Sequence, residues 1–146
     1  MKKIITFAAV VFSAAFLMSA CCSEKRDLPK GIDGKAIAKT AKSWIVKLDK
    51  GYFQQCYDET SQTLKNNLDR KQWFDNMTAY RKPLGESGKR KEINMFYEAQ
   101  LQTGERGDFV TVQYGSVFQQ KLAVVENITF VKEEDDSWRI LVYWLK

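Results

Sequence analysis

The 146-residue sequence contains no histidine, only three cysteines and only two prolines. Without histidine, neither a Ser-His-Asp triad nor an H-E-x-x-H zinc site can form. The sequence also lacks a C-x-x-C pair and a G-x-S-x-G nucleophile elbow. This composition excludes histidine-based and metal-thiolate chemistry, and we expect no metal and no cofactor. Carboxylates and tyrosines are the remaining candidates for general acid–base catalysis.

The first residues have the layout of a secretory signal. Lys2 and Lys3 precede an apolar run over residues 4–20, which ends in small residues. The alternative is a retained transmembrane anchor, but a run of 17 residues lies at the short limit for crossing a bilayer. We therefore expect residues 1–20 to be a signal peptide that is removed.

The end of this signal, LMSAC, resembles a bacterial lipobox, in which the cysteine is lipidated and becomes the new first residue. The resemblance implies lipid attachment at Cys21, export, and a membrane-anchored protein that faces the periplasm of a bacterial cell envelope. Simple signal cleavage without lipidation is the alternative. Residues 21–32 mix charges with Pro29 and Gly31 and have no apolar period, so they indicate a tether.

The mature chain has only a mild positive charge. Removal of residues 1–20 takes away Lys2 and Lys3, which lowers the net charge from +5 to +3. This charge gives no support for nucleic-acid binding, which export also disfavours. The remaining length suits one compact domain over residues 33–146.

The first half of the domain has helical periodicity. Asp33 is the expected N-cap of a long amphipathic helix that ends before Gly51. A short helix is expected around residues 53–57, and a further turn over residues 61–68. Asp69 and Gln72 then form the expected capping box of a helix that Pro83 terminates.

The stretch YRKPLGESGKRK, residues 80–91, gathers five basic residues around two glycines and invites a phosphate-loop interpretation. Its spacing does not match G-x-x-x-x-G-K-[ST], and it follows a helix and precedes a strand, which is the opposite order. We expect it to be a helix-to-strand connection, with Gly85 and Gly88 supplying the flexible backbone for the reversal.

The second half alternates with a period of two. Strands are expected from Arg90 to about residue 101, over 109–118, over 122–132 and over 138–145. The last strand is almost uniformly apolar, which predicts a central position covered on both faces. The acidic run EEDD before it is expected to be a solvated hairpin tip rather than a calcium site.

Helices followed by strands predict an α+β fold, with the N-terminal helices packed on one face of a curved four-stranded antiparallel meander sheet. This order resembles the cone-shaped nuclear-transport-factor-like folds.

Four segments follow one another along the domain: LDKGYFQQCYD, KQWFDNMTAYRKPLGESGKRK, QYGSVFQQKLAVVENITFV and SWRILVYW. They resemble successive blocks of the bacterial exported family catalogued as domain of unknown function 4019. The most specific positions of the likeness are Trp73, Arg81, Pro83-Leu84-Gly85, Arg90, Phe118, Lys121, Glu126, Trp138-Arg139 and Tyr143. Cys56 and Tyr57 depart from that family's usual serine and tryptophan. The resemblance implies fold and export, and it implies no activity.

The functional prediction is a non-catalytic envelope lipoprotein that binds a ligand or a partner. The alternative is a small hydrolase- or isomerase-like enzyme with a pocket between helices and sheet. Its acid–base groups would come from Tyr57, Asp58, Tyr97, Tyr114 and Glu126. The partner classes are the membrane, through the lipid, and a second copy or another envelope protein.

Three charged residues are candidate structural or binding groups. Glu126 lies in the apolar run AVVENITF, and a buried carboxylate is expected to pair with an arginine because an unpaired interior charge is costly. Arg81 and Arg90 are the candidates for that pairing, and the sequence does not decide between them. Cys56 is expected to be a core residue, with a disulfide to Cys22 as the alternative.

Overall fold

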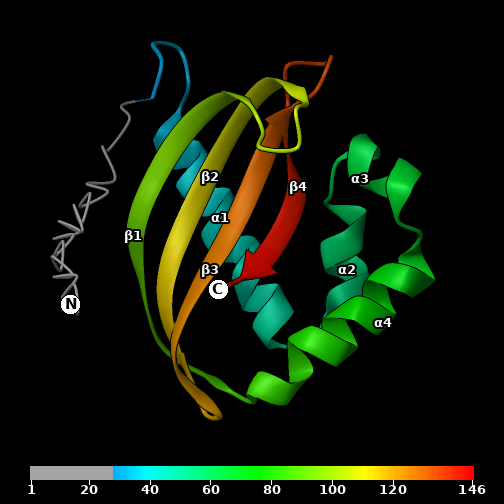
Figure 1. Ribbon diagram of the computed structural model, residues 1–146, viewed down its shortest axis with the longest axis vertical. Coiled ribbons are helices and arrows are strands. Elements are labelled where there is room, and N and C mark those ends of the chain that lie inside the picture. The colour runs from blue at the N-terminus through cyan, green and yellow to red at the C-terminus, as the bar shows by residue number, and fades with distance from the viewer. Residues whose placement is uncertain (1–27) are drawn as a thin grey trace, which may run out of the picture.

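The computed structural model describes residues 28–146 (Figure 1). Its elements in chain order are α1 (Gly34–Asp49), α2 (Phe53–Asp58), α3 (Gln62–Asn67), α4 (Arg70–Tyr80), the 3-10 turn η1 (Lys82–Leu84), β1 (Ser87–Gln100), β2 (Arg106–Phe118), β3 (Lys121–Lys132) and β4 (Trp138–Leu145). The expected signal peptide, Cys21 and Cys22 lie outside the described residues. The predicted α+β order of helices and then strands is confirmed.

The four strands form one antiparallel sheet in the order β1-β2-β3-β4, and the sheet is not closed. This is the predicted meander. Figure 1 shows α1 running across one face of the curved sheet, while α2, α3 and α4 lie beside β4. No helix among residues 28–146 is both long enough and apolar enough to span a membrane.

The helix starts follow the capping signals in the sequence. The Asp33 carboxylate accepts hydrogen bonds from the backbone N–H groups of Lys35 and Ala36, which would otherwise lack partners in the first turn of α1. Asp69 and Gln72 form the reciprocal capping box at the start of α4. Both predicted caps are confirmed.

The core lies between α1 and the sheet and continues under α2 and α4. Two tryptophans join the helices: Trp44 Nε1 donates to the Cys56 carbonyl at 3.0 Å, and Trp73 Nε1 donates to the Phe53 carbonyl at 2.7 Å. Cys56 is fully buried, as expected for a core residue, and burial raises the pKa of its thiol to about 12. The thiol is therefore protonated and unreactive at neutral pH.

The packed part of the chain starts before the expected domain boundary at residue 33. Leu28 and Ile32 are partly buried and pack against the core. Leu28 also approaches the backbone of Gly34. Leu28 and Ile32, which lie in the expected tether, therefore contact the domain, whereas residues 29–31 between them are exposed.

The predicted central position of the last strand is wrong. β4 is the edge strand of the sheet, and among residues 28–146 it pairs with β3 alone, apart from an isolated bridge between Thr60 and Ile140. Its side chains at Ile140 and Tyr143 are buried, whereas Val142 and Trp144 are 38% and 45% exposed. Apolar residues on both faces of a strand therefore indicate that both faces can be covered. They do not indicate whether the strand has one neighbouring strand or two.

The connection after α4 is more structured than the sequence predicted. α4 ends at Tyr80, and a 3-10 turn that includes Pro83 follows it, because proline is tolerated in a first turn where its missing N–H is not needed. Gly85 has a φ of 74°, as a reversal requires. Gly88 does not serve the reversal, since it lies inside β1, which begins at Ser87 and not at Arg90.

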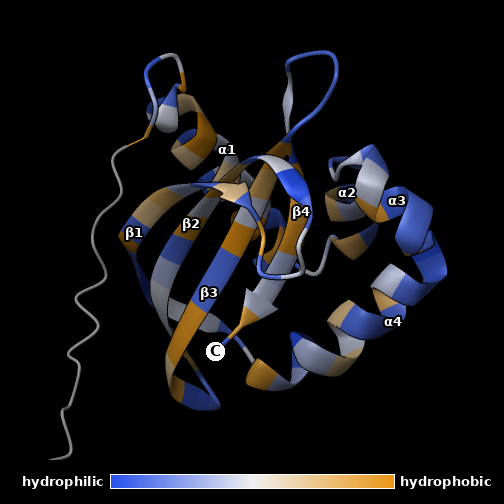
Figure 2. Ribbon diagram, turned by 45° about the horizontal axis from the view of Figure 1, so that its top comes forward, coloured by the Kyte–Doolittle hydropathy of each residue, from blue (hydrophilic) through white to orange (hydrophobic). Residues whose placement is uncertain are grey.

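The other strand ends agree more closely with the pattern. β2 begins at Arg106, three residues before the expected start, and β3 begins at Lys121. The acidic run forms the loop between β3 and β4, with Asp136 at a φ of 62°. Figure 2 shows this loop as a hydrophilic projection and shows a hydrophilic stretch between two hydrophobic stretches along β3.

Candidate functional site

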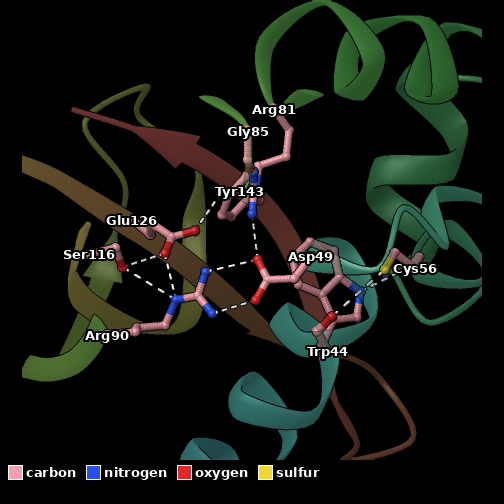
Figure 3. Close-up of polar contacts among 9 residues, drawn as sticks. All are labelled: Trp44, Asp49, Cys56, Arg81, Gly85, Arg90, Ser116, Glu126 and Tyr143. Atoms are coloured by element: carbon pink, nitrogen blue, oxygen red, sulfur yellow. Dashed lines mark hydrogen bonds and ion pairs between the residues drawn. The ribbon is translucent and has the colours of Figure 1, made fainter. Parts of the chain in front are cut away.

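A cluster of charged and hydroxyl side chains lies where the helices meet the sheet (Figure 3). We call it the ionic cluster, and its members are Asp49, Arg81, Arg90, Ser116, Glu126 and Tyr143. They come from the end of α1, the C-cap of α4, and β1, β2, β3 and β4 in that order. The cluster therefore joins six elements of the fold.

Glu126 is the most buried member, with no exposed surface. One carboxylate oxygen accepts hydrogen bonds from Arg90 Nε at 2.6 Å and from the Ser116 hydroxyl. The other accepts from the Tyr143 hydroxyl at 2.6 Å. The arginine that meets Glu126 is therefore Arg90, and both carboxylate oxygens are occupied.

Arg81 does not touch Glu126 but reaches the cluster through Asp49. The Asp49 carboxylate accepts from Arg90 Nη1 at 2.6 Å, from Arg90 Nη2 at 2.9 Å, and from Arg81 Nη2. The two-pronged contact with Arg90 is the strong geometry for a guanidinium and a carboxylate. The Arg81 guanidinium also lies over the Phe118 ring, 4.3 Å from its centroid.

Sequence reasoning missed Asp49, which joins the two arginines. Asp49 is the last residue of α1, where the helix dipole disfavours a negative charge. An acidic residue in that position hints at a cationic partner from elsewhere in the fold, so a signal was present. Ser116 gave no signal, and Tyr143 was indicated only as a position of the family likeness, because the roles of both residues depend on strand register.

Burial and charge set the protonation states of the cluster. Burial alone would raise the pKa of Asp49, but the hydrogen bonds and positive charge of Arg90, together with Arg81, hold it below its usual value of 3.8. Burial alone would lower the pKa of Arg90, but its hydrogen bonds to Asp49 and Glu126 outweigh burial and raise this pKa above its ordinary value. Burial and the negative charge of Glu126 raise the pKa of Tyr143, so its phenol remains a neutral donor.

Of the five pocket groups expected for an enzyme, only Tyr114 and Glu126 lie opposite each other, in the pairing of β2 with β3. Tyr57 donates to the Leu68 carbonyl, Asp58 pairs with Arg70 at the surface, and Tyr97 donates to Asp108 at 2.6 Å. These groups and Glu126 thus have separate partners on separate elements. The remaining candidate behaves differently. The Tyr114 hydroxyl is buried without a hydrogen-bond partner among the described residues.

The described residues form a groove between the helices and the edge strand, which we call the β4 groove. It has a volume of about 510 Å³, and Arg81 links it to the ionic cluster. Its apolar lining includes Leu64, Leu68 and Met77 from the helical side and Val142, Trp144 and Leu145 from β4. No aspartate or glutamate lines it within the described chain, and its charged lining residues are Arg81 and Lys121.

A second pocket of about 540 Å³ lies on another side of Arg81, where Asp49, Lys50, Lys82 and Glu86 give it a mixed charge. Within residues 28–146, no three acidic or cysteine side chains are grouped to hold a metal ion. The arrangement can therefore brace the fold and present an apolar groove, and the described carboxylates of the cluster are already engaged.

Comparison with known proteins gives one result that bears on identity. No curated protein matches the chain. The family model described as Protein of unknown function (DUF4019) matches residues 40–143, a range that includes every member of the ionic cluster. The resemblance that the sequence blocks indicated is confirmed, and the chain belongs to the DUF4019 family.

Proposed function

We propose that this protein is an exported envelope lipoprotein whose domain binds a ligand or partner in the β4 groove and performs no catalysis. The observation that carries the proposal is the groove itself. It is apolar, has a volume of about 510 Å³ and lies beside an ionic cluster whose carboxylates already have partners. A concave apolar site with a few polar groups is the usual form of a binding site.

The state of the carboxylates favours binding over acid–base chemistry. A general base must reach a proton of the substrate within hydrogen-bonding distance. Glu126 has no exposed surface, and Asp49 accepts from two arginines. The groove offers substrate an arginine and a lysine but no carboxylate within the described chain.

The groove also defines the chemistry of its occupant. Its walls are apolar, and its charged lining residues, Arg81 and Lys121, are both positive. A ligand that buries apolar surface and carries a negative charge would match both features. The occupant we propose is therefore apolar with an anionic group.

The test uses 1-anilinonaphthalene-8-sulfonate, an apolar anion whose fluorescence rises on burial, with the full-length Cys21→Ala protein. We expect saturable binding, and Val142→Glu should weaken it at least about ten-fold by placing a like charge in the apolar groove. Val117→Glu is the matched control, because Val117 is 37% exposed against 38% for Val142 but does not line the groove. Equal effects of the two variants, or no saturable binding, would overturn the proposal.

Anchoring is tested separately at Cys21. One acyl chain gives only marginal membrane binding, at about 0.8 kcal/mol per buried methylene, so stable attachment needs the several chains of a bacterial lipoprotein. Labelled palmitate should enter the native protein, and the Cys21→Ala protein should be unlabelled and appear in the aqueous fraction. Palmitate incorporation into Cys21→Ala would contradict the assignment, and Cys22→Ala is the control that should keep the label.

A further inference from the structure

The free edge of β4 faces the β4 groove with unpaired backbone groups. Lys146 and Val125 exchange both of their backbone hydrogen bonds, each at 2.9 Å. Hydrogen-bonded and non-hydrogen-bonded pairs alternate along an antiparallel ladder. Tyr143 and Leu145, which lie opposite Ile128 and Glu126, therefore direct their N–H and C=O groups away from β3.

The upstream part of this edge is already covered by the chain. The Ser61 N–H donates to the Ile140 carbonyl at 2.8 Å, and Thr60 forms a parallel bridge with Ile140. Within residues 28–146, this is the one place where a segment outside the sheet forms a backbone hydrogen bond with the edge. The chain then turns into α3, and the edge beyond Ile140 opens onto the groove, which Tyr143 and Leu145 line.

We propose that the β4 groove takes an extended peptide segment of another protein, which adds to β4 as a fifth strand. This inference rests on the proposed function, because it names the occupant of the same groove. An acyl chain would fill the apolar space but would leave the backbone groups of Tyr143 and Leu145 unpaired. An extended peptide satisfies those groups and places alternate side chains against the apolar lining.

The charges of the groove specify the segment further. Arg81 is 3% exposed, its Nε has no hydrogen-bond partner, and the residue lines the groove. Lys121 lines the same groove and is exposed. A segment with apolar residues at alternate positions and a carboxylate, either of an acidic side chain or of its C-terminus, would pair with Lys121 and accept from the free Nε of Arg81, whose other nitrogens already donate to Asp49 and Gly85.

A second copy of this chain fits the groove less well than a single segment. Pairing of β4 with β4 across a two-fold axis would bring α3 and α4 of both copies to the same edge. Figure 1 shows these helices standing beside β4. A single extended segment needs room for one strand only between the helices and β4, so it avoids this crowding. The occupant is therefore a segment of a different protein.

The experiment measures binding of a labelled pool of short peptides to the full-length Cys21→Ala protein. The peptides have apolar residues at alternate positions and a C-terminal glutamate. Two further pools carry N-methyl groups on every second peptide nitrogen, one in each register. We expect the pool to bind and to displace 1-anilinonaphthalene-8-sulfonate. Methylation in one register should weaken binding at least about ten-fold, since each lost backbone bond costs affinity, and methylation in the other should not.

The possible outcomes separate the two proposals. If dye binds in the groove but neither register of methylation weakens peptide binding, or no peptide binds, strand addition is overturned and the groove proposal stands. If the dye does not bind saturably, the groove proposal fails first. Val142→Glu should abolish peptide binding while Val117→Glu should not. If the protein instead self-associates in sedimentation and Val142→Glu makes it monomeric, the second copy is the occupant and the inference is wrong.

Discussion

The ionic cluster and the β4 groove share two residues but have opposite properties. Arg81 and Tyr143 belong to both, because each contributes polar atoms to the cluster and also lines the groove. In the cluster, buried charges and hydroxyls form hydrogen bonds with one another. In the groove, apolar side chains are uncovered and the backbone groups at the strand edge have no hydrogen-bond partner within the described chain. The difference indicates a division of work. The cluster fixes α4 through Arg81 and β4 through Tyr143, so it holds the two walls of the groove at a set separation.

The largest expected effect comes from breaking the cluster at its centre. Glu126→Gln should lower the free energy of unfolding by roughly 3 to 5 kcal/mol, because it removes one partner of a buried ion pair. Urea denaturation of the purified variant measures the loss. Glu92→Gln is the matched control, since Glu92 is exposed on β1 and should change stability little.

A double mutant identifies the coupling within the cluster. Glu126→Gln combined with Arg90→Gln should destabilise the protein by less than the sum of the single variants, because the two residues share a hydrogen bond. The pair Glu126→Gln and Arg81→Gln should be closer to additive, since no direct contact joins them. Unchanged or raised stability of Glu126→Gln would make its carboxylate the leading candidate for a functional acid.

Local signals in the sequence were enough to predict most of the fold. Short stretches of sequence are enough to predict three features: the caps at Asp33 and Asp69, the change from a helical to a two-residue period, and the order of the elements. The position of β4 in the sheet could not be predicted in this way, because an apolar strand has the same sequence pattern at the edge and at the centre of a sheet. The strand order depends on which neighbours exist, and that is a property of the whole chain.

The cluster and the groove were less predictable for the same reason. The Glu126–Arg90 contact joins residues 36 apart in the sequence, and the Arg81–Asp49 contact joins residues 32 apart. The sequence indicated that Glu126 needs an arginine, but it did not decide between Arg81 and Arg90. The groove is formed by α4 and β4, which are not adjacent in the sequence, and neither segment alone shows an opening.

A smaller effect, with a distinctive pH dependence, is expected from Asp49→Asn. Asp49 is partly exposed, so the loss should be about 2 kcal/mol, between the values for exposed and buried pairs. The pKa of Asp49 is lowered in the folded state, so its contribution is present above its ordinary value of 3.8 and is lost as the pH falls through the lower folded-state pKa.

Acid denaturation of the two proteins checks this sign. The native protein should lose more stability than Asp49→Asn when the pH falls from about 5 to 2, because only the native protein must protonate this carboxylate. The curves should therefore converge at low pH. A constant difference between them across that range would show that Asp49 acts through packing and not through its charge.

The rim of the cluster should be less sensitive still. Gly85 accepts a hydrogen bond from Arg81 Nη1 through its carbonyl, and its φ of 74° is unfavourable for any residue with a Cβ. Gly85→Val should cost about 1 to 2 kcal/mol from backbone conformation, and its Cβ would also lie 2.8 Å from Gln119 Oε1. Thermal denaturation measures it against Gly88→Ala, whose φ is not positive and whose cost should be smaller.

The smallest effect is expected where charges are neither buried nor paired. Lys82, Lys89 and Lys91 lie in the basic stretch beside the cluster, and no ion pair joins them to another described residue. Replacing all three with glutamine should change the free energy of unfolding by less than about 0.5 kcal/mol per site, since such surface positions contribute little. The melting temperature should therefore stay close to that of the native protein, in contrast to Glu126→Gln. If the triple variant lost binding to a phosphate-bearing envelope component that the native protein retains, the stretch would be an anion site. Its surface charges would then contribute to function and not to stability.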